Sequence, residues 1–269
     1  YKNGEVIHSE KIVAGEISKQ TPIFSRPMKK IVFRPKWRVP ESIKVRELWP
    51  SMLKGGGQMT AFGLQLETKD GQPLDWRKID WTKTDIRNYE VVQPPGPRSV
   101  LGLVKFAFPS QHTVYMHDTI KEGLFKPAVR ANGHNCIRME HPAKLAEVLL
   151  SEDKGWQSQQ VQDLLVKGND SAVALAHPIP VHTTYFTAVV DDDGKLRTFG
   201  DVYGLDRKVA PVVLGKTVAF AATADNAPAA APAADDNDAP QASAPSASAQ
   251  TKTKPKENVA GDLQGLFGD

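Results

Sequence analysis

Apolar and polar residues alternate in several short stretches of this chain, and a period of two predicts β-strands. Leu103 to Phe108 and Thr113 to His117 alternate in this way. The stretch from Val181 to Val190 is rich in β-branched and aromatic residues. A turn at Asp193-Gly194, with Leu196 to Phe199 beyond it, then predicts a hairpin. These segments indicate a core built mainly from strands.

Helical patterns are fewer. Pro142 to Leu150 has the composition and spacing of a helix, with its proline at an allowed first-turn position. Gln157 to Lys167 predicts a second helix that ends at Gly168-Asn169. Pro40 to Ile43 has the proline and the acidic residue typical of a helix start. Glu5 to about Ile23 is strand-like, although a glycine and a proline interrupt it. We therefore predict an α+β fold, mainly β with some helices.

The stretch between about Pro40 and Pro97 differs from its surroundings. It is irregular and contains the turn-forming segments Gly55-Gly56-Gly57, Asp70-Gly71 and Gln93-Pro94-Pro95-Gly96-Pro97. Four tryptophans fall within or just before it: Trp37, Trp49, Trp76 and Trp81. We expect an inserted lid subdomain at about residues 41–97, in which most of these tryptophans pack a small core.

The C-terminal part, from about Ala222 to Asn258, consists mostly of Ala, Pro, Asp, Ser and Lys. Such a segment buries too little apolar surface to offset the entropy lost on ordering. We therefore predict one domain over residues 1–221 and a disordered tail over 222–269. Leu263 to Phe267 restores some hydrophobicity. It is interpreted either as a frayed terminus or as a docking motif for a protein partner.

Charge is distributed unevenly. The whole chain carries +3, but the part from Asp225 onward has seven acidic and three basic residues, so the part before it carries +7. A mildly basic body suits a carboxylate-bearing substrate, although surface charge of this size often serves solubility alone. We expect no nucleic-acid partner. The sequence contains no run of about 18 apolar residues, so no membrane span is predicted.

The start of the sequence bears on location. Asn3-Gly4 lies between alternating residues and predicts a two-residue hairpin turn, whose first strand would lie mostly before Tyr1. The sequence therefore looks cut within a hairpin, and we expect an export signal or anchor in the part upstream of Tyr1.

Cys136 is the single cysteine, so the chain cannot form an internal disulfide. A lone cysteine is more often a small buried apolar residue than a nucleophile. The residues around Cys136 must therefore decide between these two roles. His117 follows a predicted strand, and His134 lies in the loop that leads into Cys136. A thiol attacks as the thiolate, and a cationic partner, commonly histidine, would have to lower its pKa. Two histidines and a cysteine could also form part of a zinc site, but a structural zinc usually has four ligands and more cysteines. We expect no metal and no cofactor.

The sequence resembles the L,D-transpeptidases with a YkuD-type catalytic domain, and among them a subgroup with a long lid insertion. That family has a strand histidine, a gap of about one and a half dozen residues, and then Ser/Thr-His/Ser-Gly-Cys-x-Arg. His117 precedes Cys136 by 19 positions, and Cys136-Ile137-Arg138 matches the end of the motif. The resemblance covers roughly residues 1 to 208. Other matching stretches are Thr21-Pro22, Arg34 to Pro40, Gln93 to Pro97, Gly102 to Phe106, Pro178 to Thr187 and Asp201 to Gly204.

The resemblance implies a YkuD-like mixed β-sandwich and a role for each matching residue. Cys136 would be the nucleophile that attacks diaminopimelate in a peptidoglycan stem peptide, and His117 would be its general base and acid. Backbone amides of Cys136 and Asn135 would bind the oxyanion. Substrate-positioning groups would be Tyr115, His134, Arg138 and Asp118. For Tyr115 and Arg138, packing in the core or in a salt bridge is the alternative. The family implies a periplasmic location and covalent inhibition by carbapenems.

Two positions depart from the motif. Asn135 stands where the family usually has glycine, and Gly133 stands where it has a hydroxyl residue. If that glycine adopts a positive φ, asparagine is the residue best able to replace it. The alternatives left open are therefore a different acyl acceptor, namely a protein terminus or amine, a D-amino acid or water, and an inactive peptidoglycan-binding module.

Overall fold

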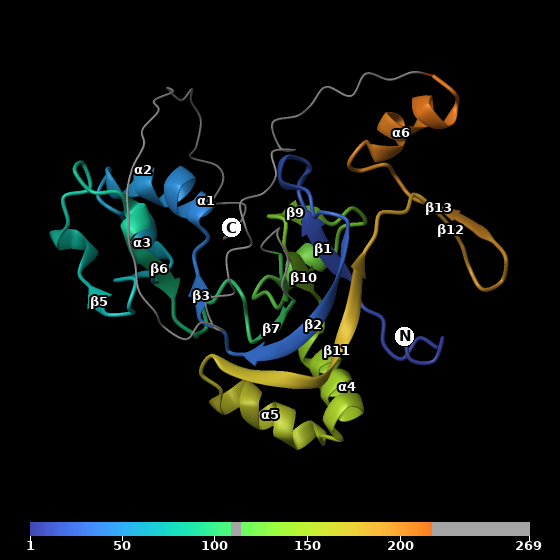
Figure 1. Cartoon of the computed structure of the whole chain (residues 1–269), viewed down its shortest axis with the longest axis horizontal. Helices are drawn as coiled ribbons and strands as arrows, with labels where there is room; N and C mark the ends of the chain where they lie inside the picture. The colour runs from blue at the N-terminus through green and yellow to red at the C-terminus, as the bar shows by residue number, and fades with distance from the viewer. Residues whose placement is uncertain (109–113, 217–269) are drawn as a thin grey trace.

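The computed structural model of the chain describes residues 1–108 and 114–216. Its centre is a mixed seven-stranded sheet in the order β11-β2-β7-β8-β10-β1-β9 (Figure 1). The strands are β1 (Ile12–Gly15), β2 (Phe24–Phe33), β7 (Val104–Ala107), β8 (Met116–His117), β9 (Ala131–Gly133), β10 (Ile137–Met139) and β11 (Ser171–Thr183).

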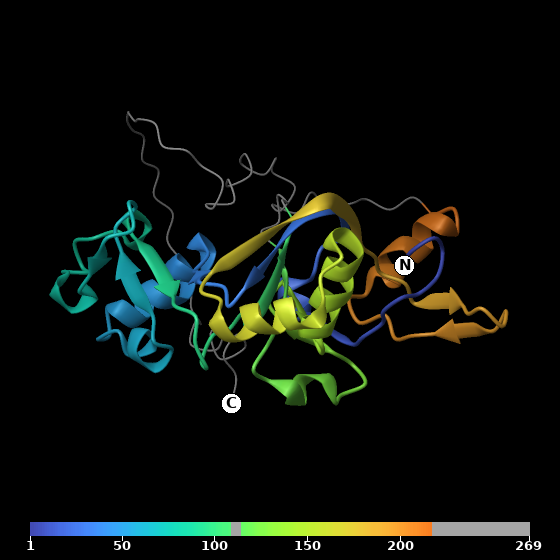
Figure 2. The same cartoon turned by 90° about the horizontal axis from the view of Figure 1, so that it is seen from below.

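Two helices cover one face of this sheet. They are α4 (Pro142–Lys154) and α5 (Ser158–Lys167), and Figure 2 shows them together on one side of β2 and β11. Alternation along the strands directs apolar side chains toward these helices. The resulting core includes Ile31, Phe33, Val104, Phe106, Met139, Leu150 and Leu165. The predictions of strands at Leu103 to Phe108 and near His117, and of both helices, are confirmed.

The stretch after β2 forms a separate small sheet with the strand order β3-β6-β4-β5. Its strands are β3 (Trp37–Arg38), β4 (Gln65–Glu67), β5 (Pro73–Leu74) and β6 (Glu90–Gln93). Its helical segments are α1 (Glu41–Ile43), η2 (Lys44–Leu48), α2 (Trp49–Met52), α3 (Gly57–Ala61), η3 (Trp76–Lys78) and η4 (Ile86–Asn88). The interpretation of residues 40–97 as irregular was therefore wrong. The elements are too short to show a clear period in the sequence, and the packing of their side chains specifies them.

This inserted subdomain has its own core. Trp37 and Trp81 are buried in it with aliphatic residues such as Leu48, Leu66 and Val91, whereas Trp76 packs at its edge. The buried Gln93 side chain, at the end of β6, binds the chain segments where the subdomain ends. Its amide nitrogen donates to the carbonyls of Phe62 and Arg98, each at 2.8 Å. Its amide oxygen accepts from Val100 N at 2.9 Å.

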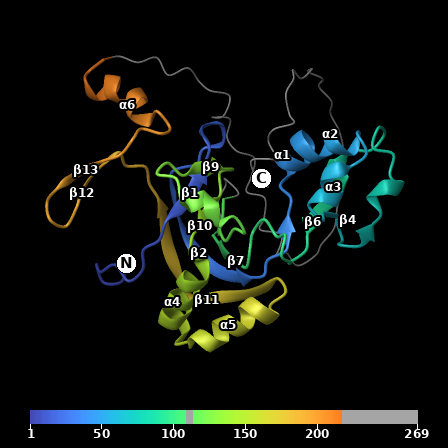
Figure 3. The same ribbon diagram turned by 180° about the vertical axis from the view of Figure 1, so that it is seen from behind.

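The predicted C-terminal hairpin is present as β12 (Ala188–Val190) and β13 (Leu196–Thr198). Its first strand, expected over Val181 to Val190, is shorter, because the residues up to Thr183 belong to β11 and pair with β2. It projects with α6 (Leu205–Val213) on the side away from the inserted subdomain (Figure 3). Near the N-terminus, the expected turn is present as a bridge between Lys2 and Glu5. The strand-like stretch from Glu5 to about Ile23, interrupted by Gly15 and Pro22, is strand only in part. Only β1 pairs there, because the chain bends into η1 (Ile17–Lys19) after Gly15.

The α+β fold class with mixed sheets is confirmed. Short 3-10 turns complete it, among them η5 (Glu122–Phe125). The predicted tail over 222–269, the docking motif at Leu263 to Phe267 and the start of the strand expected at Thr113 lie outside the described residues. Among helices of the described ranges, none is long and apolar enough to cross a membrane.

Candidate active site

The register of two neighbouring strands gathers the predicted residues on one face of the sheet. β8 and β10 run parallel, with Met116 opposite Ile137 and His117 opposite Arg138. Tyr115 lies two positions before His117, and Cys136 lies two positions before Arg138. Because side chains alternate along an extended chain, Tyr115 and Cys136 turn to the same side as His117 and Arg138. Ile137 N donates to Tyr115 O at 2.9 Å and fixes this register where the strands begin. We call the sheet surface formed by Tyr115, His117, Cys136 and Arg138 the cysteine face.

Helices α4 and α5 do not cover the cysteine face. Met139, which follows Arg138, belongs to the core beneath those helices, so Arg138 points to the other side. Cys136 is half-buried, whereas His117 and Arg138 are each 5% exposed. The face thus combines a half-buried cysteine with two groups that are held away from water.

His117 has a defined orientation. Its Nδ1 lies 2.6 Å from the backbone carbonyl oxygen of Asp118. A carbonyl oxygen only accepts hydrogen bonds, so Nδ1 carries the ring proton and Nε2 keeps a free lone pair. An imidazole in this tautomer is suited to accept a proton through Nε2.

The electrostatic surroundings favour an uncharged resting pair. Burial, with a smaller contribution from the nearby charge of Arg138, lowers the pKa of His117 to about 3. Burial raises the pKa of the Cys136 thiol, although the backbone amide of Tyr115 and the charges of Lys105 and Arg138 act in the opposite direction. The expectation of a thiolate held by a cationic histidine is therefore wrong for the resting site, where desolvation outweighs the local charges.

Lys105 joins the cysteine face from β7, and the sequence analysis missed it. It is paired in register with His117, and its Nζ lies 3.8 Å from the centroid of the Tyr115 ring. The signal was present in the sequence. Lys105 stands between the apolar Val104 and Phe106 of a predicted strand, so alternation places it on the face opposite to theirs.

The loop that leads into Cys136, the proposed nucleophile, is bonded directly by Thr21, and Thr21 is linked through Gly15 to Tyr203. The Thr21 hydroxyl donates to the carbonyl of Asn135 at 3.0 Å and accepts from Gly15 N at 2.9 Å. The Tyr203 hydroxyl donates to the carbonyl of Gly15 at 2.6 Å. These bonds give a physical role to Thr21-Pro22 and Asp201 to Gly204, two stretches noted only for their resemblance to the family.

The two motif departures are accommodated without strain. Asn135 is not among the non-glycine residues with positive φ, so this position does not require a left-handed conformation in this chain. Gly133 also has an ordinary φ, but an added Cβ there would lie 3.2 Å from Ala14 O and 3.3 Å from an Arg138 guanidinium nitrogen. Gly133 thus allows Arg138 to lie against the loop, where that side chain donates to Asn132 O at 3.0 Å.

His134 lies at the boundary with the inserted subdomain. Its Nε2 is 3.2 Å from Lys19 Nζ, and Lys19 Nζ is 3.9 Å from a carboxylate oxygen of Glu47 on η2. Glu16 also lies 3.8 Å from this lysine. The contact from Glu47 through Lys19 joins the inserted subdomain to the nucleophile loop, and a polar link of this kind holds His134 in a supporting position.

Asp118 is separated from the other predicted site residues. Its carboxylate accepts from Leu103 N and from Thr119 N, both at 2.7 Å. It also lines a hollow with Glu140 and His141 at the start of α4, on the helix side of the sheet. Gly102 allows this position, because a Cβ there would lie 2.4 Å from the Asp118 carboxyl carbon. These contacts favour an anchoring role over contact with a substrate of Cys136.

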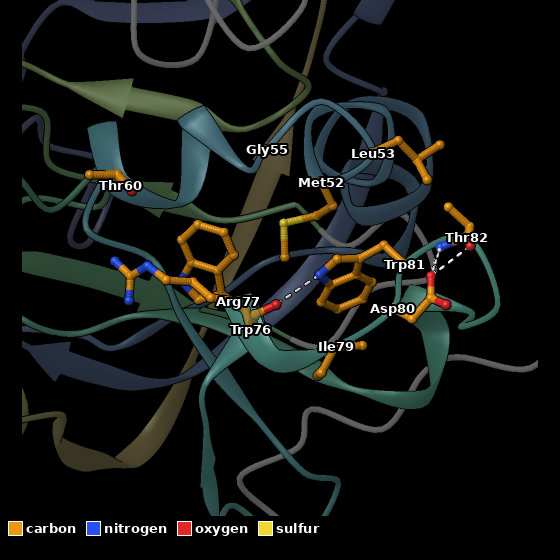
Figure 4. Close-up of a pocket in the computed structure, with 10 residues that line it drawn as sticks. All are labelled: Met52, Leu53, Gly55, Thr60, Trp76, Arg77, Ile79, Asp80, Trp81 and Thr82. Carbon is orange, nitrogen blue, oxygen red and sulfur yellow. Dashed lines mark hydrogen bonds between the residues drawn. The ribbon is translucent and has the colours of Figure 1, made fainter.

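A pocket of about 470 Å³ lies in the inserted subdomain (Figure 4). Trp76, Trp81 and Arg77 line it, with Arg77 lying over the Trp76 ring at 4.7 Å. No cysteine-face residue is among its lining side chains. In residues 1–108 and 114–216, no three His, Cys, Asp or Glu side chains are grouped so as to hold a metal ion.

Comparison with known proteins now decides the family. The model of the YkuD family, the L,D-transpeptidase catalytic domain, matches residues 1–166, which include His117 and Cys136. The chain belongs to the YkuD L,D-transpeptidase family. A Haemophilus influenzae protein named "Putative L,D-transpeptidase" is 30% identical over 210 residues. That alignment covers 78% of this chain and 42% of the relative, so the chain spans less than half of the relative's length.

In this L,D-transpeptidase domain the sheet extends beyond the matched residues. β11 lies after residue 166, yet it pairs antiparallel with β2 along most of its length. Tyr203, which braces the nucleophile loop, also lies beyond the match. The transpeptidase fold of this chain therefore depends on residues outside the region common to the family.

Proposed function

We propose that the chain is an L,D-transpeptidase domain that cross-links peptidoglycan between diaminopimelate residues through a thioester on Cys136. The observation that carries this proposal is the common face of Cys136 and His117, with His117 Nδ1 bonded to a carbonyl oxygen and Nε2 left as a base. Membership of the family supports peptidoglycan stem peptides as the substrate.

Acylation begins from the neutral pair. As Cys136 Sγ attacks the diaminopimelate carbonyl carbon, its proton passes to His117 Nε2, so the thiolate forms only during attack. The oxyanion accepts hydrogen bonds from the backbone amides of Cys136 and Asn135. When the tetrahedral intermediate collapses, the C–N bond breaks and His117 returns the proton to the amine of the departing D-alanine. A thioester on Cys136 remains.

Transfer to the acceptor repeats these steps in reverse order. The side-chain amine of diaminopimelate in a neighbouring stem attacks the thioester carbonyl and gives a proton to His117. The C–S bond then breaks, and His117 protonates the leaving thiolate. The products are the cross-linked peptide and free Cys136, so bonds and protons balance across the cycle.

Incubation with purified disaccharide-tetrapeptide, followed by mass spectrometry, tests the reaction. The proposal predicts a dimer that lacks one D-alanine. Tripeptide alone would mean that water is the acceptor and would overturn the cross-linking proposal in favour of a carboxypeptidase. Exchange of the terminal D-alanine for an added D-amino acid, or transfer of the diaminopimelate acyl group from Cys136 to a protein amine, would identify the other acceptors that this chemistry allows.

An inactive wall-binding module is the second candidate, because Asn135 departs from the family motif. A carbapenem separates the two by intact-mass measurement. We expect one adduct on the unmodified protein and none on Cys136→Ala. If the unmodified protein forms no adduct at neutral pH, the binding-module proposal is favoured.

The same proposal extends to location and domain limits. Peptidoglycan stems lie outside the cytoplasmic membrane, so we propose that the protein acts in the periplasm. We also propose residues 1–221 as the catalytic domain, with the lid at about 41–97 and a tail that serves as a tether or contacts a protein partner. Truncation after about Val218 is expected to leave the melting temperature and the carbapenem adduct unchanged.

A further inference from the structure

A cationic side chain with no assigned role lies on the cysteine face. Lys105 is in register with His117 on the neighbouring strand β7. Its Nζ is 3.8 Å from the centroid of the Tyr115 ring, and the Tyr115 amide is itself bonded to the Cys136 thiol. The ammonium group is therefore held above the ring of a residue whose backbone lies beside the Cys136 segment.

The packing around Lys105 fixes its direction. Its strand neighbours Val104 and Phe106 are both fully buried in the core under α4 and α5. The Lys105 side chain therefore points to the opposite side of the sheet, where it is half-buried. A lysine over an aromatic ring gains a cation–π attraction, which limits the positions of its flexible side chain.

The residues paired in register with His117 across the sheet carry charge of one sign. The charged members of the His117 row are Lys105 and Arg138, both cationic, and the row continues into Val32 and Val13. Two cations near a half-buried thiol attract an anion, and partial exclusion of water strengthens this attraction. No carboxylate belongs to this register row within the described strands.

We infer that Lys105, held over Tyr115, forms a carboxylate-binding subsite beside Cys136. Naming the ligand rests on the proposed function: the carboxylate is that of the residue released from the donor stem, which lies next to the bond that Cys136 attacks. Lys105 is thus a specificity residue. It favours donors whose leaving residue ends in a free carboxylate over donors in which that group is an amide or a further peptide bond.

Charge-selective alkylation tests the subsite without any transpeptidation. Iodoacetate and iodoacetamide deliver nearly the same group to the single cysteine, one as an anion and one as a neutral molecule. For the wild-type protein, the ratio of the iodoacetate rate to the iodoacetamide rate should exceed that of free glutathione and should fall as salt is added. A ratio equal to that of glutathione overturns the proposal, and this arm requires no variant.

Variants then assign the effect to Lys105. We expect Lys105→Met to reduce the rate ratio by about tenfold, the lower end of the range for charge focused in a cleft, and Lys105→Arg to restore most of it. Lys144→Met is the matched control, since it removes the same charge from α4 on the other side of the sheet. An unchanged ratio in Lys105→Met, or equal slowing by both reagents, contradicts the assignment.

A second pair of reagents tests the identity of the ligand. A tetrapeptide donor with a free terminal carboxylate is compared with the same donor as its terminal carboxamide, by release of D-alanine or D-alaninamide. Wild type should prefer the free acid through a lower KM, and Lys105→Met should lose this preference. If alkylation shows the subsite but the preference is absent, the ligand is wrong. If neither donor reacts, the proposed function fails while the anion subsite stands.

Discussion

The Nδ1 nitrogen of His117 lies 2.6 Å from the backbone carbonyl oxygen of Asp118, the next residue in the chain. This short local bond fixes the tautomer of a side chain whose other partners come from distant strands. It also explains how a histidine that is 5% exposed avoids an unsatisfied polar atom on that side of the ring. The proposal that His117 is the base rests on this orientation, and the predictions below test the proposal and the contacts that support it.

Replacement of the two candidate histidines should give unequal effects. His117→Ala is expected to slow carbapenem acylation of Cys136 by about 10²–10⁴-fold, the usual loss when a general base is removed. His134→Ala should cause a smaller defect, because His134 contacts Lys19 at the subdomain boundary. Intact-mass time courses measure both. A near-normal rate in His117→Ala together with an inactive His134→Ala would show that the assignment is wrong.

The rate of acylation should vary little with acidity. Because the pKa of His117 is lowered to about 3, the imidazole stays neutral and basic at pH 5. A histidine with its ordinary pKa of about 6.5 would be only ~3% neutral there, and the rate would fall about 30-fold from its neutral-pH value. Adduct formation measured between pH 7.5 and pH 5 distinguishes these cases, and a midpoint near pH 6.5 would contradict the prediction.

The lowered pKa of His117 also predicts a loss of stability in acid. Below about pH 6.5 the unfolded chain protonates His117, whereas the folded chain does not until about pH 3. The free energy of unfolding should therefore fall as the pH decreases through this window, by at most about 1.4 kcal/mol per pH unit from this group. Urea unfolding of wild type and His117→Gln at several pH values measures it. The difference between the two proteins should be constant above pH 6.5, and a constant difference down to pH 4 would rule the effect out.

Thr21 should support the nucleophile loop through its hydroxyl. Thr21→Val keeps the shape but removes the bonds to Asn135 O and from Gly15 N. We expect a loss of about 1–3 kcal/mol in the free energy of unfolding and slower acylation of Cys136, because the loop amides lose their support. Thr21→Ser retains the hydroxyl and serves as the control. Equal rates in the valine and serine variants would show that the brace has no effect on the chemistry.

Gly15 should tolerate no side chain. A Cβ there would lie 2.0 Å from Lys19 O and 3.0 Å from His134 O, both backbone atoms that cannot move aside cheaply. We expect Gly15→Ala to lower the free energy of unfolding by about 1–3 kcal/mol, as overpacking usually does. Gly123→Ala is the matched control, since its Cβ meets nothing within 4 Å. Similar melting temperatures for the two variants would contradict this account.

The sequence by itself determined the local structure around the site. Alternation predicted β7 and the strand that carries His117, and composition predicted α4 and α5. The single cysteine and the spacing of His117, Cys136 and Arg138 indicated the chemistry and the family. These properties are encoded over a few neighbouring residues, because side-chain direction and helix propensity depend on local backbone geometry.

Only the tertiary structure decided which distant residues share the site and in what charge state. Strand register brought Lys105 beside His117. The path of the chain brought Thr21 to the loop before Cys136 and Tyr203 to Gly15, which bonds Thr21 in turn. Asp118, adjacent to His117 in sequence, turned to the other side. The neutral His117 and Cys136 pair also lay beyond sequence reasoning, because pKa depends on desolvation by atoms that the folded chain supplies from every direction.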